Sequence, residues 1–186
     1  MTTLLTSMSV LGGDLDLMDG NTQLKRYFIT HNHLIGAAEY FAQQMTVKSE
    51  ISFNAMGCAL FCALALEASI NYIGSEKFSI WNEHLEKKLS PQGKLELIAS
   101  HAQYKVDYGQ KPFQSFRELF KLRNQLVHGK MQVLDYKDAR RPTSLLETLC
   151  TGERAKSFLQ DTEQMVTILH DISGVEAIPS FILSLG

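Results

Sequence analysis

An arginine and a histidine in the second half of the chain have the residue types and the spacing for chemistry on phosphate groups. Arg123 and His128 lie in the segment RNQLVHG (residues 123–129), at the end of a stretch with helical periodicity. A histidine titrates near neutral pH and can move a proton, while a guanidinium stabilises charge that develops on phosphate oxygens. This pair therefore predicts acid–base chemistry on a phosphodiester.

Arg123 also lies on the helix face that should be buried. At 100° per residue it points to the centre of a broad apolar arc. That arc is formed by Phe113, Phe116, Leu119, Phe120, Leu122, Leu126 and Val127. An unpaired guanidinium facing a core is energetically costly, so Arg123 needs an acidic partner, a polar cleft or an anionic ligand.

The sequence offers one carboxylate on a second helix as that partner. Glu67 is the only formal charge in residues 51–73, a segment that is apolar nearly all round. A lone carboxylate there faces the same energetic cost, so we predict that Glu67 meets Arg123 and that Asn71, one turn further on, adds hydrogen bonds. In the alternative interpretation, this ion pair only fixes the register of two helices.

The positions around the helix limit what the motif can do. Asn124 and His128 are four residues apart and share one helix edge, whereas Arg123 lies about 140° from His128. Only the long arginine side chain could bring both groups to one anion. His128 falls on the last turn of the predicted helix, where the helix dipole favours a protonated imidazole.

A second arginine and histidine have the same spacing, so spacing alone is not decisive. Arg26 precedes His31 by five residues, and His33 follows two residues later. With 6 histidines in the chain, such pairs arise readily by chance. Because Arg26 falls within a predicted helix and no histidine there marks a helix end, we interpret His31 and His33 as surface or core-edge residues.

The composition is typical of an ordinary soluble domain. A chain of 186 residues with 45% hydrophobic and 20% charged residues can bury a full core. The formal net charge of −2 provides no general attraction to nucleic acid, so contact with a polyanion requires a local patch. The predicted phosphate contacts in such a patch are Lys121, Lys130, Arg140 and Arg141.

We expect no metal, no cofactor and no membrane segment. Cys58, Cys62 and Cys150 look like small core residues of a reducing compartment, and no ligands at zinc spacing accompany the first two. The longest apolar stretch, residues 55–66, is too short to span a membrane. The first ten residues show no secretion-signal pattern, which favours a cytoplasmic protein.

The hydrophobic periodicity predicts an all-α fold, an antiparallel bundle of about five to six helices. Expected helices cover residues 23–45, 49–73, 78–89, 91–103, 112–128 and 152–172, with Trp81 in the core. Residues 1–20 are predicted to form a flexible arm, 21–186 a single helical domain, and 130–142 an extended or looped segment within it. Ser90 and Pro91 should begin one helix, and Gly74, Gly129 and Gly174 should each end one.

The motif at residues 123–128 resembles the signature of the HEPN superfamily, in which an arginine and a polar residue are followed by a short spacer and a histidine. The preceding FRELFKL segment (residues 116–122) is amphipathic, and ALEASIN (residues 65–71) is similar to the acidic first-helix segment of many members. The resemblance covers residues 50–172. It implies an all-α bundle, commonly a homodimer in which two motifs line one cleft.

The resemblance also implies a metal-independent endoribonuclease, often within a toxin–antitoxin or antiphage system, with RNA as substrate and an antitoxin as a further partner. Arg123 and His128 would be catalytic, Asn124 would orient the site, and Glu67 and Asn71 would support it. The alternative, from a different functional class, is a non-catalytic HEPN-like helical interaction or scaffold module.

Overall fold

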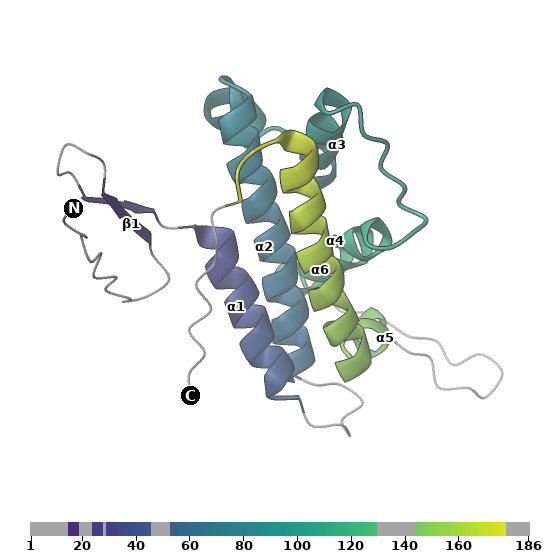
Figure 1. The fold of residues 1–186 in the computed structure, drawn as a ribbon. Coiled ribbons are helices and arrows are strands. Elements are labelled where there is room, and N and C mark those ends of the chain that lie inside the picture. The colour runs from purple at the N-terminus through teal and green to yellow at the C-terminus, as the bar shows by residue number, and fades with distance from the viewer. Residues whose placement is uncertain (1–14, 19–23, 28, 46–52, 130–143, 178–186) are drawn as a thin grey trace, which may run out of the picture. The chain divides into compact units, whose positions relative to one another are not determined.

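The computed structural model describes residues 15–18, 24–27, 29–45, 53–129 and 144–177. The chain divides into two units, and Figure 1 shows the helices of the second. One consists of Met1–Ile29 together with Ile178–Gly186, and the other is a helical unit, Thr30–Ala177.

A short hairpin replaces part of the predicted first helix. Strand β1 (Leu15–Met18) pairs antiparallel with β2 (Leu24–Tyr27). Their register places Leu15 opposite Tyr27 and Met18 opposite Leu24. Residues 24–27 are therefore a strand rather than the start of a helix, and the sequence prediction was wrong there. Of the predicted flexible arm, only β1 lies within the described residues.

The helical unit contains six α-helices and one π-helical turn within its described residues. They are α1 (Thr30–Gln43), α2 (Phe53–Lys77), η1 (Trp81–Leu85), α3 (Pro91–His101), α4 (Phe113–Val127), α5 (Leu145–Leu149) and α6 (Gly152–Ser173). The predicted all-α character is confirmed for this unit.

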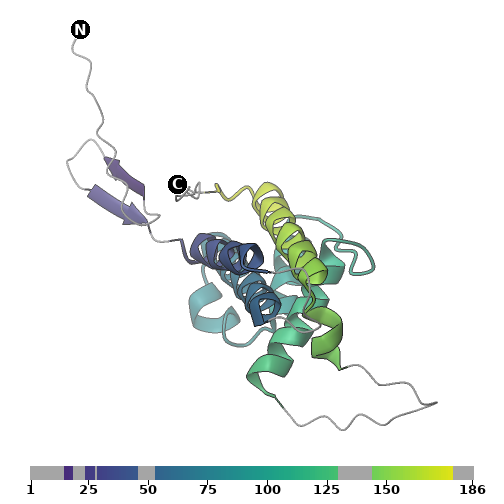
Figure 2. The same cartoon turned by 90° about the horizontal axis from the view of Figure 1, so that it is seen from below.

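Helix α2 is the centre of the helical unit. It packs against α1, α3, α4 and α6. Seen along the bundle, α1 and α6 lie on one side of α2 and α4 on another (Figure 2). Because neighbours surround it, α2 buries residues on most of its circumference, including Cys58 and Cys62. Both are free thiols in the core, as is Cys150, and this part of the sequence prediction is confirmed.

The apolarity of α2 extends beyond the segment recognised in the sequence. Over an 18-residue window its mean hydropathy is 1.6, so by length and composition alone α2 is the one described helix that could cross a membrane. Half of that window is buried inside the helical unit. A central core helix passes the same test, and the packing of α2 accounts for its composition.

Gly74 is inside α2 and does not end it, contrary to the sequence prediction. A Cβ atom built on Gly74 would lie 2.2 Å from ring atoms Cε2 and Cζ2 of Trp81. The glycine therefore allows the indole to lie directly on the backbone of α2. Trp81 is fully buried, as the sequence predicted.

Two helix ends agree with their predicted signals. The Oγ of Ser90 accepts a hydrogen bond from the Gly93 N–H at 3.1 Å, and Pro91 takes the first position of α3. Gly174 ends α6 in the left-handed conformation, with φ of 63° and ψ of 20°.

The end of α4 differs from its prediction. Gly174 is the only described glycine with positive φ, so Gly129 does not act as a left-handed cap. Instead His128 is the last capping residue, with φ of −108° and ψ of 27°, and its backbone N–H donates to the Asn124 carbonyl at 2.9 Å. Helix α4 therefore ends with this hydrogen bond and without a left-handed glycine.

Helix α5 was not predicted, although its signal is present in the sequence. Ser144 and Glu147 form a capping box in which each side chain accepts a hydrogen bond from the backbone N–H of the other. The helix is only five residues long, which is too short to show an apolar period. Residues 130–142, predicted to be looped or extended, lie outside the described residues.

We expect Gly74→Ala to lower the free energy of unfolding by about 1 to 3 kcal/mol, because the new methyl group must displace the Trp81 ring. Gly36→Ala in α1 is the matched control, since no atom lies within 4 Å of the place that its new methyl group would take and alanine favours helix by about 1 kcal/mol. Urea unfolding of both variants measures the difference. Equal effects of the two substitutions would contradict the packing role of Gly74.

Candidate functional site

Helix α4 presents two distinct faces. Phe116, Leu119 and Leu122 are among the residues that it buries against the core. A single exposed stripe runs along the opposite side, because its members recur every three or four residues. We call it the α4 stripe, and it consists of Gln114, Arg117, Lys121, Asn124 and His128.

Arg123 lies at the border between these two faces. Its Nη2 atom is 3.4 Å from Oε2 of Glu67 on α2, so the contact predicted from the sequence is present. The two side chains retain 26% and 24% of their accessible surface. The arginine is thus at the edge of the core rather than at the centre of a buried face.

This partial exposure determines how strong the pair can be. Water still reaches both charged groups, and their single contact is longer than an ideal charge-assisted hydrogen bond. Pairs of this kind contribute about 0 to 1 kcal/mol to stability. The Glu67 contact therefore orients the guanidinium without making a large contribution to the fold.

The other nitrogens of the Arg123 guanidinium have only part of their hydrogen-bonding capacity filled. Nη1 of Arg123 donates to Oδ1 of the adjacent Asn124 at 3.1 Å. Nε of Arg123 is buried and has no hydrogen-bond partner among the described residues. Asn124 therefore contacts one terminal nitrogen of the planar group and Glu67 the other.

Asn71 supports a different cation from the one predicted. Its Oδ1 accepts a hydrogen bond at 2.8 Å from Nζ of Lys94, a lysine of α3 that is only 3% exposed. Asn71 and Glu67 are one turn apart on α2, so one polar edge of this helix contacts both α3 and α4. The buried ammonium of Lys94 takes the amide oxygen that we had assigned to Arg123.

His128 is exposed and follows the last turn of α4. Among the described residues, no hydrogen bond joins its imidazole to Arg123 or Asn124. The structure thus places the two predicted catalytic residues on one helix end but does not bring them into contact within one chain.

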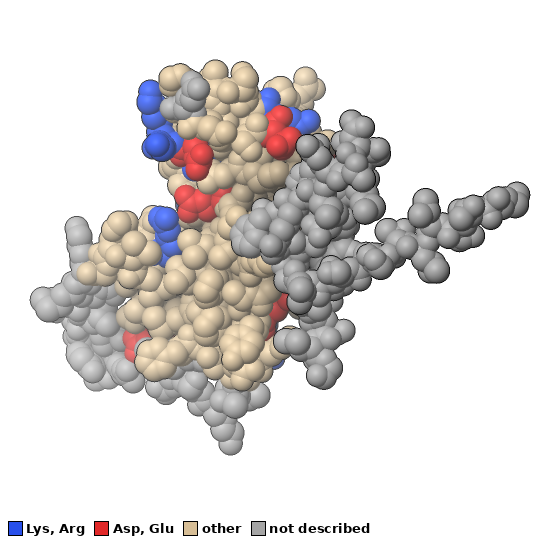
Figure 3. Space-filling model, turned by 90° about the vertical axis from the view of Figure 1, so that its left-hand side faces the viewer, with Lys and Arg blue, Asp and Glu red and all other residues tan. Residues whose placement is uncertain are grey.

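The predicted phosphate contacts are only partly described. Lys121 is exposed on the α4 stripe, whereas Lys130, Arg140 and Arg141 lie outside the described residues. One face of the molecule shows lysines and arginines only in small groups on a largely uncharged surface (Figure 3). Among the described residues of that face there is no broad basic patch.

A hollow of about 660 Å³ lies beside the α4 stripe and was not foreseen from the sequence. Its walls come from the beginning of α3, from the segment that connects α3 to α4, and from α4 itself. They are formed by Ser90, Pro91, Gln92, Tyr108, Gly109, Gln114, Phe116, Arg117, Glu118, Phe120, Lys121 and Asn124. Asn124 thus belongs both to the hollow and to the guanidinium site.

A buried carboxylate fixes the beginning of α4 against α6. Oδ2 of Asp161 accepts a hydrogen bond from Ser115 at 2.5 Å and lies 3.2 Å from Nζ of Lys111. Ser157 also contacts this oxygen, at 3.4 Å, and accepts a hydrogen bond from Lys111. The sequence carries no signal for this cluster, because Ser115 and Asp161 are 46 residues apart and periodicity does not reveal which helices meet.

A second anchor joins the middle of α4 to α6. Arg154 forms an ion pair with Glu118 through its Nη2 atom. The same guanidinium lies over the Phe158 ring, 5.0 Å from its centroid. Together with the Asp161 cluster, this contact positions the helix that presents the motif.

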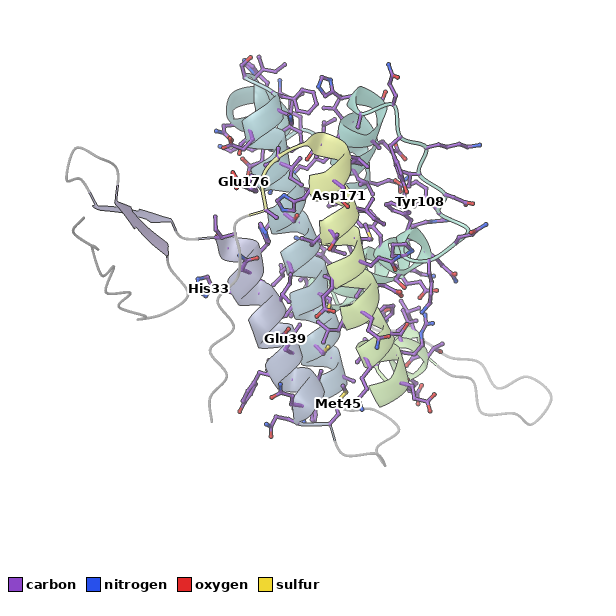
Figure 4. All side chains as sticks on the ribbon, in the orientation of Figure 1. His33, Glu39, Met45, Tyr108, Asp171 and Glu176 are labelled. Carbon is purple, nitrogen blue, oxygen red and sulfur yellow. The ribbon has the colours of Figure 1, made fainter. Side chains whose placement is uncertain are left out.

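The second histidine group lies elsewhere in the helical unit. His31 is buried, and its ring is 5.8 Å from Tyr72 and 5.7 Å from His170, centroid to centroid. His33, two residues further on, is exposed on α1 (Figure 4). Arg26 is in β2 and not in the same helix, so the equal spacing to His31 has no common helical face.

No relative supports or opposes these assignments. Comparison of the chain with protein-family models, with curated proteins and with solved structures finds no match.

Among the described residues, no three histidine, cysteine, aspartate or glutamate side chains are grouped closely enough to hold a metal ion.

The buried histidine predicts a loss of stability in acid. Burial, reinforced by the neighbouring His170, lowers the pKa of His31 from 6.5 to about 4. The folded state therefore favours neutral His31. The contribution of this residue to the free energy of unfolding is complete above pH 6.5 and is lost as the pH falls towards 4. The difference amounts to at most about 3 kcal/mol.

Urea unfolding across this pH range tests the effect, with His31→Phe compared with the unmodified chain. The variant should show a flatter decline in the free energy of unfolding, whereas His33→Phe should follow the unmodified chain. Since carboxylates also begin to protonate near pH 4, the difference between the curves is the relevant quantity. Parallel curves for all three proteins would contradict the assignment.

Proposed function

We propose that this chain is a metal-independent endoribonuclease of HEPN type that acts as a cytoplasmic homodimer. The observation that carries the proposal is the arrangement of Arg123, which contacts Glu67 at 3.4 Å and Asn124 at 3.1 Å while a quarter of its side chain stays exposed. A guanidinium held in this way can still bind an anion. His128 lies on the same helix end and is open to solvent.

In this proposal Arg123 binds the scissile phosphate and stabilises the charge that develops on its oxygens. His128 acts as the base towards the 2′-hydroxyl or as the acid towards the leaving oxygen. The 2′-oxygen forms a bond to phosphorus as the bond to the leaving 5′-oxygen breaks, so the products carry a cyclic phosphate and a 5′-hydroxyl. Asn124 and Glu67 orient the guanidinium.

Two copies of the chain fit this chemistry better than one. Within one chain, no hydrogen bond joins Arg123 and His128 among the described residues. In a homodimer the two motifs would line one cleft, and the arginine of one copy could serve the same phosphate as the histidine of the other. A toxin–antitoxin or antiphage role, with an antitoxin as partner, belongs to the same proposal and follows from the resemblance of the motif.

Cleavage of RNA by the purified chain in excess chelator tests the proposal. We expect His128→Ala and Arg123→Ala each to lower the cleavage rate by at least about a hundredfold, because each removes a group that acts in the transition state. A cyclic phosphate end on the product checks the chemistry. Lys156→Ala, an exposed lysine of α6, is the control for a change of surface charge.

Cleavage that proceeds unchanged in both motif variants would overturn the assignment. So would cleavage that stops on adding chelator, since the proposed chemistry uses no metal. Thermal unfolding of each variant must accompany the assay, so that a loss of activity is not confused with a loss of folded protein.

A non-catalytic interaction or scaffold module is the second candidate, and the Glu67–Arg123 contact between α2 and α4 favours it. If this contact is purely structural, Arg123→Ala should destabilise strongly by leaving a carboxylate without its partner. The partial exposure of both groups instead predicts a loss of only about 1 kcal/mol. Urea unfolding of Arg123→Ala and Glu67→Gln decides between the two, and a loss of several kcal/mol would favour the scaffold.

A further inference from the structure

The hollow beside α4 has the chemical character of a site for an aromatic anion. Phe116 and Phe120, which are only 1% and 8% exposed, form an apolar floor with ring centroids 4.5 Å apart. Its volume of about 660 Å³ lies within the range of small-molecule sites. A flat heterocycle could therefore enter between the start of α3 and the α4 stripe.

Tyr108 supplies a third ring at the edge of this hollow. It comes from the segment between α3 and α4 (Figure 4), and its centroid lies 6.4 Å from that of Phe116. Its hydroxyl donates to Oε1 of Glu96 at 3.3 Å, which keeps the ring in place. Because Phe116 and Phe120 are buried, the partly exposed ring of Tyr108 is the one on which a nucleobase could stack.

The charges of the hollow favour an anion. Among the described residues that line it, Glu118 is the only acid, and this carboxylate is already engaged by Arg154 and by Gln114. Arg117 and Lys121 line the same hollow, are both exposed, and form no ion pair with a described residue. The lining therefore carries two positive charges that a phosphate could neutralise.

The hollow and the proposed cleavage site share one residue, Asn124. Asn124 lines the hollow and also accepts the hydrogen bond from Arg123. The α4 stripe then leads from the hollow through Asn124 to His128. A strand that places one phosphate at Arg123 would bring a neighbouring nucleotide to the hollow.

We propose that this hollow is a nucleobase subsite that binds an unpaired base next to the scissile phosphate, so that the substrate is single-stranded RNA. The inference rests on the proposed function for its choice of RNA. A paired base has both faces stacked and its edge covered, and it cannot enter a hollow between two helices. Arg117 and Lys121 would hold the flanking phosphates, while Tyr108 would stack on the base.

The test measures binding and cleavage separately. Binding of a labelled single-stranded oligoribonucleotide is followed by fluorescence anisotropy in the His128→Ala background, where no cut is expected. Adding Arg117→Gln with Lys121→Gln should weaken binding about tenfold and reduce its salt dependence. Adding Tyr108→Leu should weaken binding several-fold with little change in salt dependence. The control pair, Lys77→Gln with Lys156→Gln, removes two exposed charges outside the hollow and should leave affinity nearly unchanged.

Three probes define what the hollow recognises. The single strand should bind more tightly than an RNA duplex of equal length, than a strand with abasic positions, and than polyglutamate of similar charge. If duplex or polyglutamate binds equally well and responds equally to the double substitution, the hollow recognises charge alone and the nucleobase subsite is wrong. Unchanged binding of the single strand by the hollow variants also overturns it.

Cleavage by the chain with intact His128 separates this inference from the proposed function. Binding that depends on the hollow without any cleavage would contradict the ribonuclease proposal and leave the subsite standing. Cleavage that is unaffected by substitution of Arg117, Lys121 and Tyr108 would contradict the nucleobase subsite and leave the ribonuclease proposal standing.

Discussion

Glu67 is the one formal charge between residues 53 and 73 of the central helix α2, and its need for water and a cation constrains how the neighbouring helices pack around it. Helix α2 is covered by α1, α3, α4 and α6, yet Glu67 in its middle cannot be sealed from water without a cation. The structure meets this need at one edge, where α4 contributes Arg123 and water still reaches both groups. One turn further along, Asn71 makes a corresponding contact with Lys94 of α3. This polar edge therefore faces the two helices that also line the hollow.

The partial exposure of the Glu67–Arg123 pair also suits the site for binding an anion. A deeply buried ion pair would be rigid but neutralised, and a fully exposed arginine would be mobile. Arg123 lies between these limits. Its Nη2 atom donates to Glu67 and its Nη1 atom to Asn124, while part of its surface stays exposed to solvent. Preorganisation of this kind lowers the cost of binding an anion, because the side chain has already lost much of its freedom.

Features encoded by local chemistry were predictable from the sequence. Ser90 with Pro91 marked a helix start, Gly174 marked a helix end, and the lone charge at Glu67 identified the partner of Arg123. Each of these depends on residues within one helix or on a single charge that lacks an alternative partner. The roles of Arg123 and His128 in catalysis stay predictions.

Features that depend on contacts between distant segments were missed. Gly74 looked like a helix end because nothing local shows that Trp81 must lie against it. Tertiary packing places the carboxylate of Asp161 against α4 and places Tyr108 beside the hollow. Neither the Asp161 contact nor the hollow can therefore be predicted from the hydrophobic period of the sequence. Residues 24–27 were assigned to a helix because pairing with residues 15–18 is invisible to a helical period.

The polar contacts of α4 are unevenly distributed along its length, and this has a consequence for local stability. Asp161 holds its first turn through Ser115, and Arg154 holds its middle, whereas among the described residues the last turns make only the partly exposed side-chain contacts of Arg123. Segments with fewer buried contacts open at lower free energy than the whole domain. The backbone amides near His128 should therefore exchange with solvent by fraying of the helix end, while those near Phe116 exchange only when the core unfolds. The end that bears the motif can change shape without disturbing the bundle that holds it.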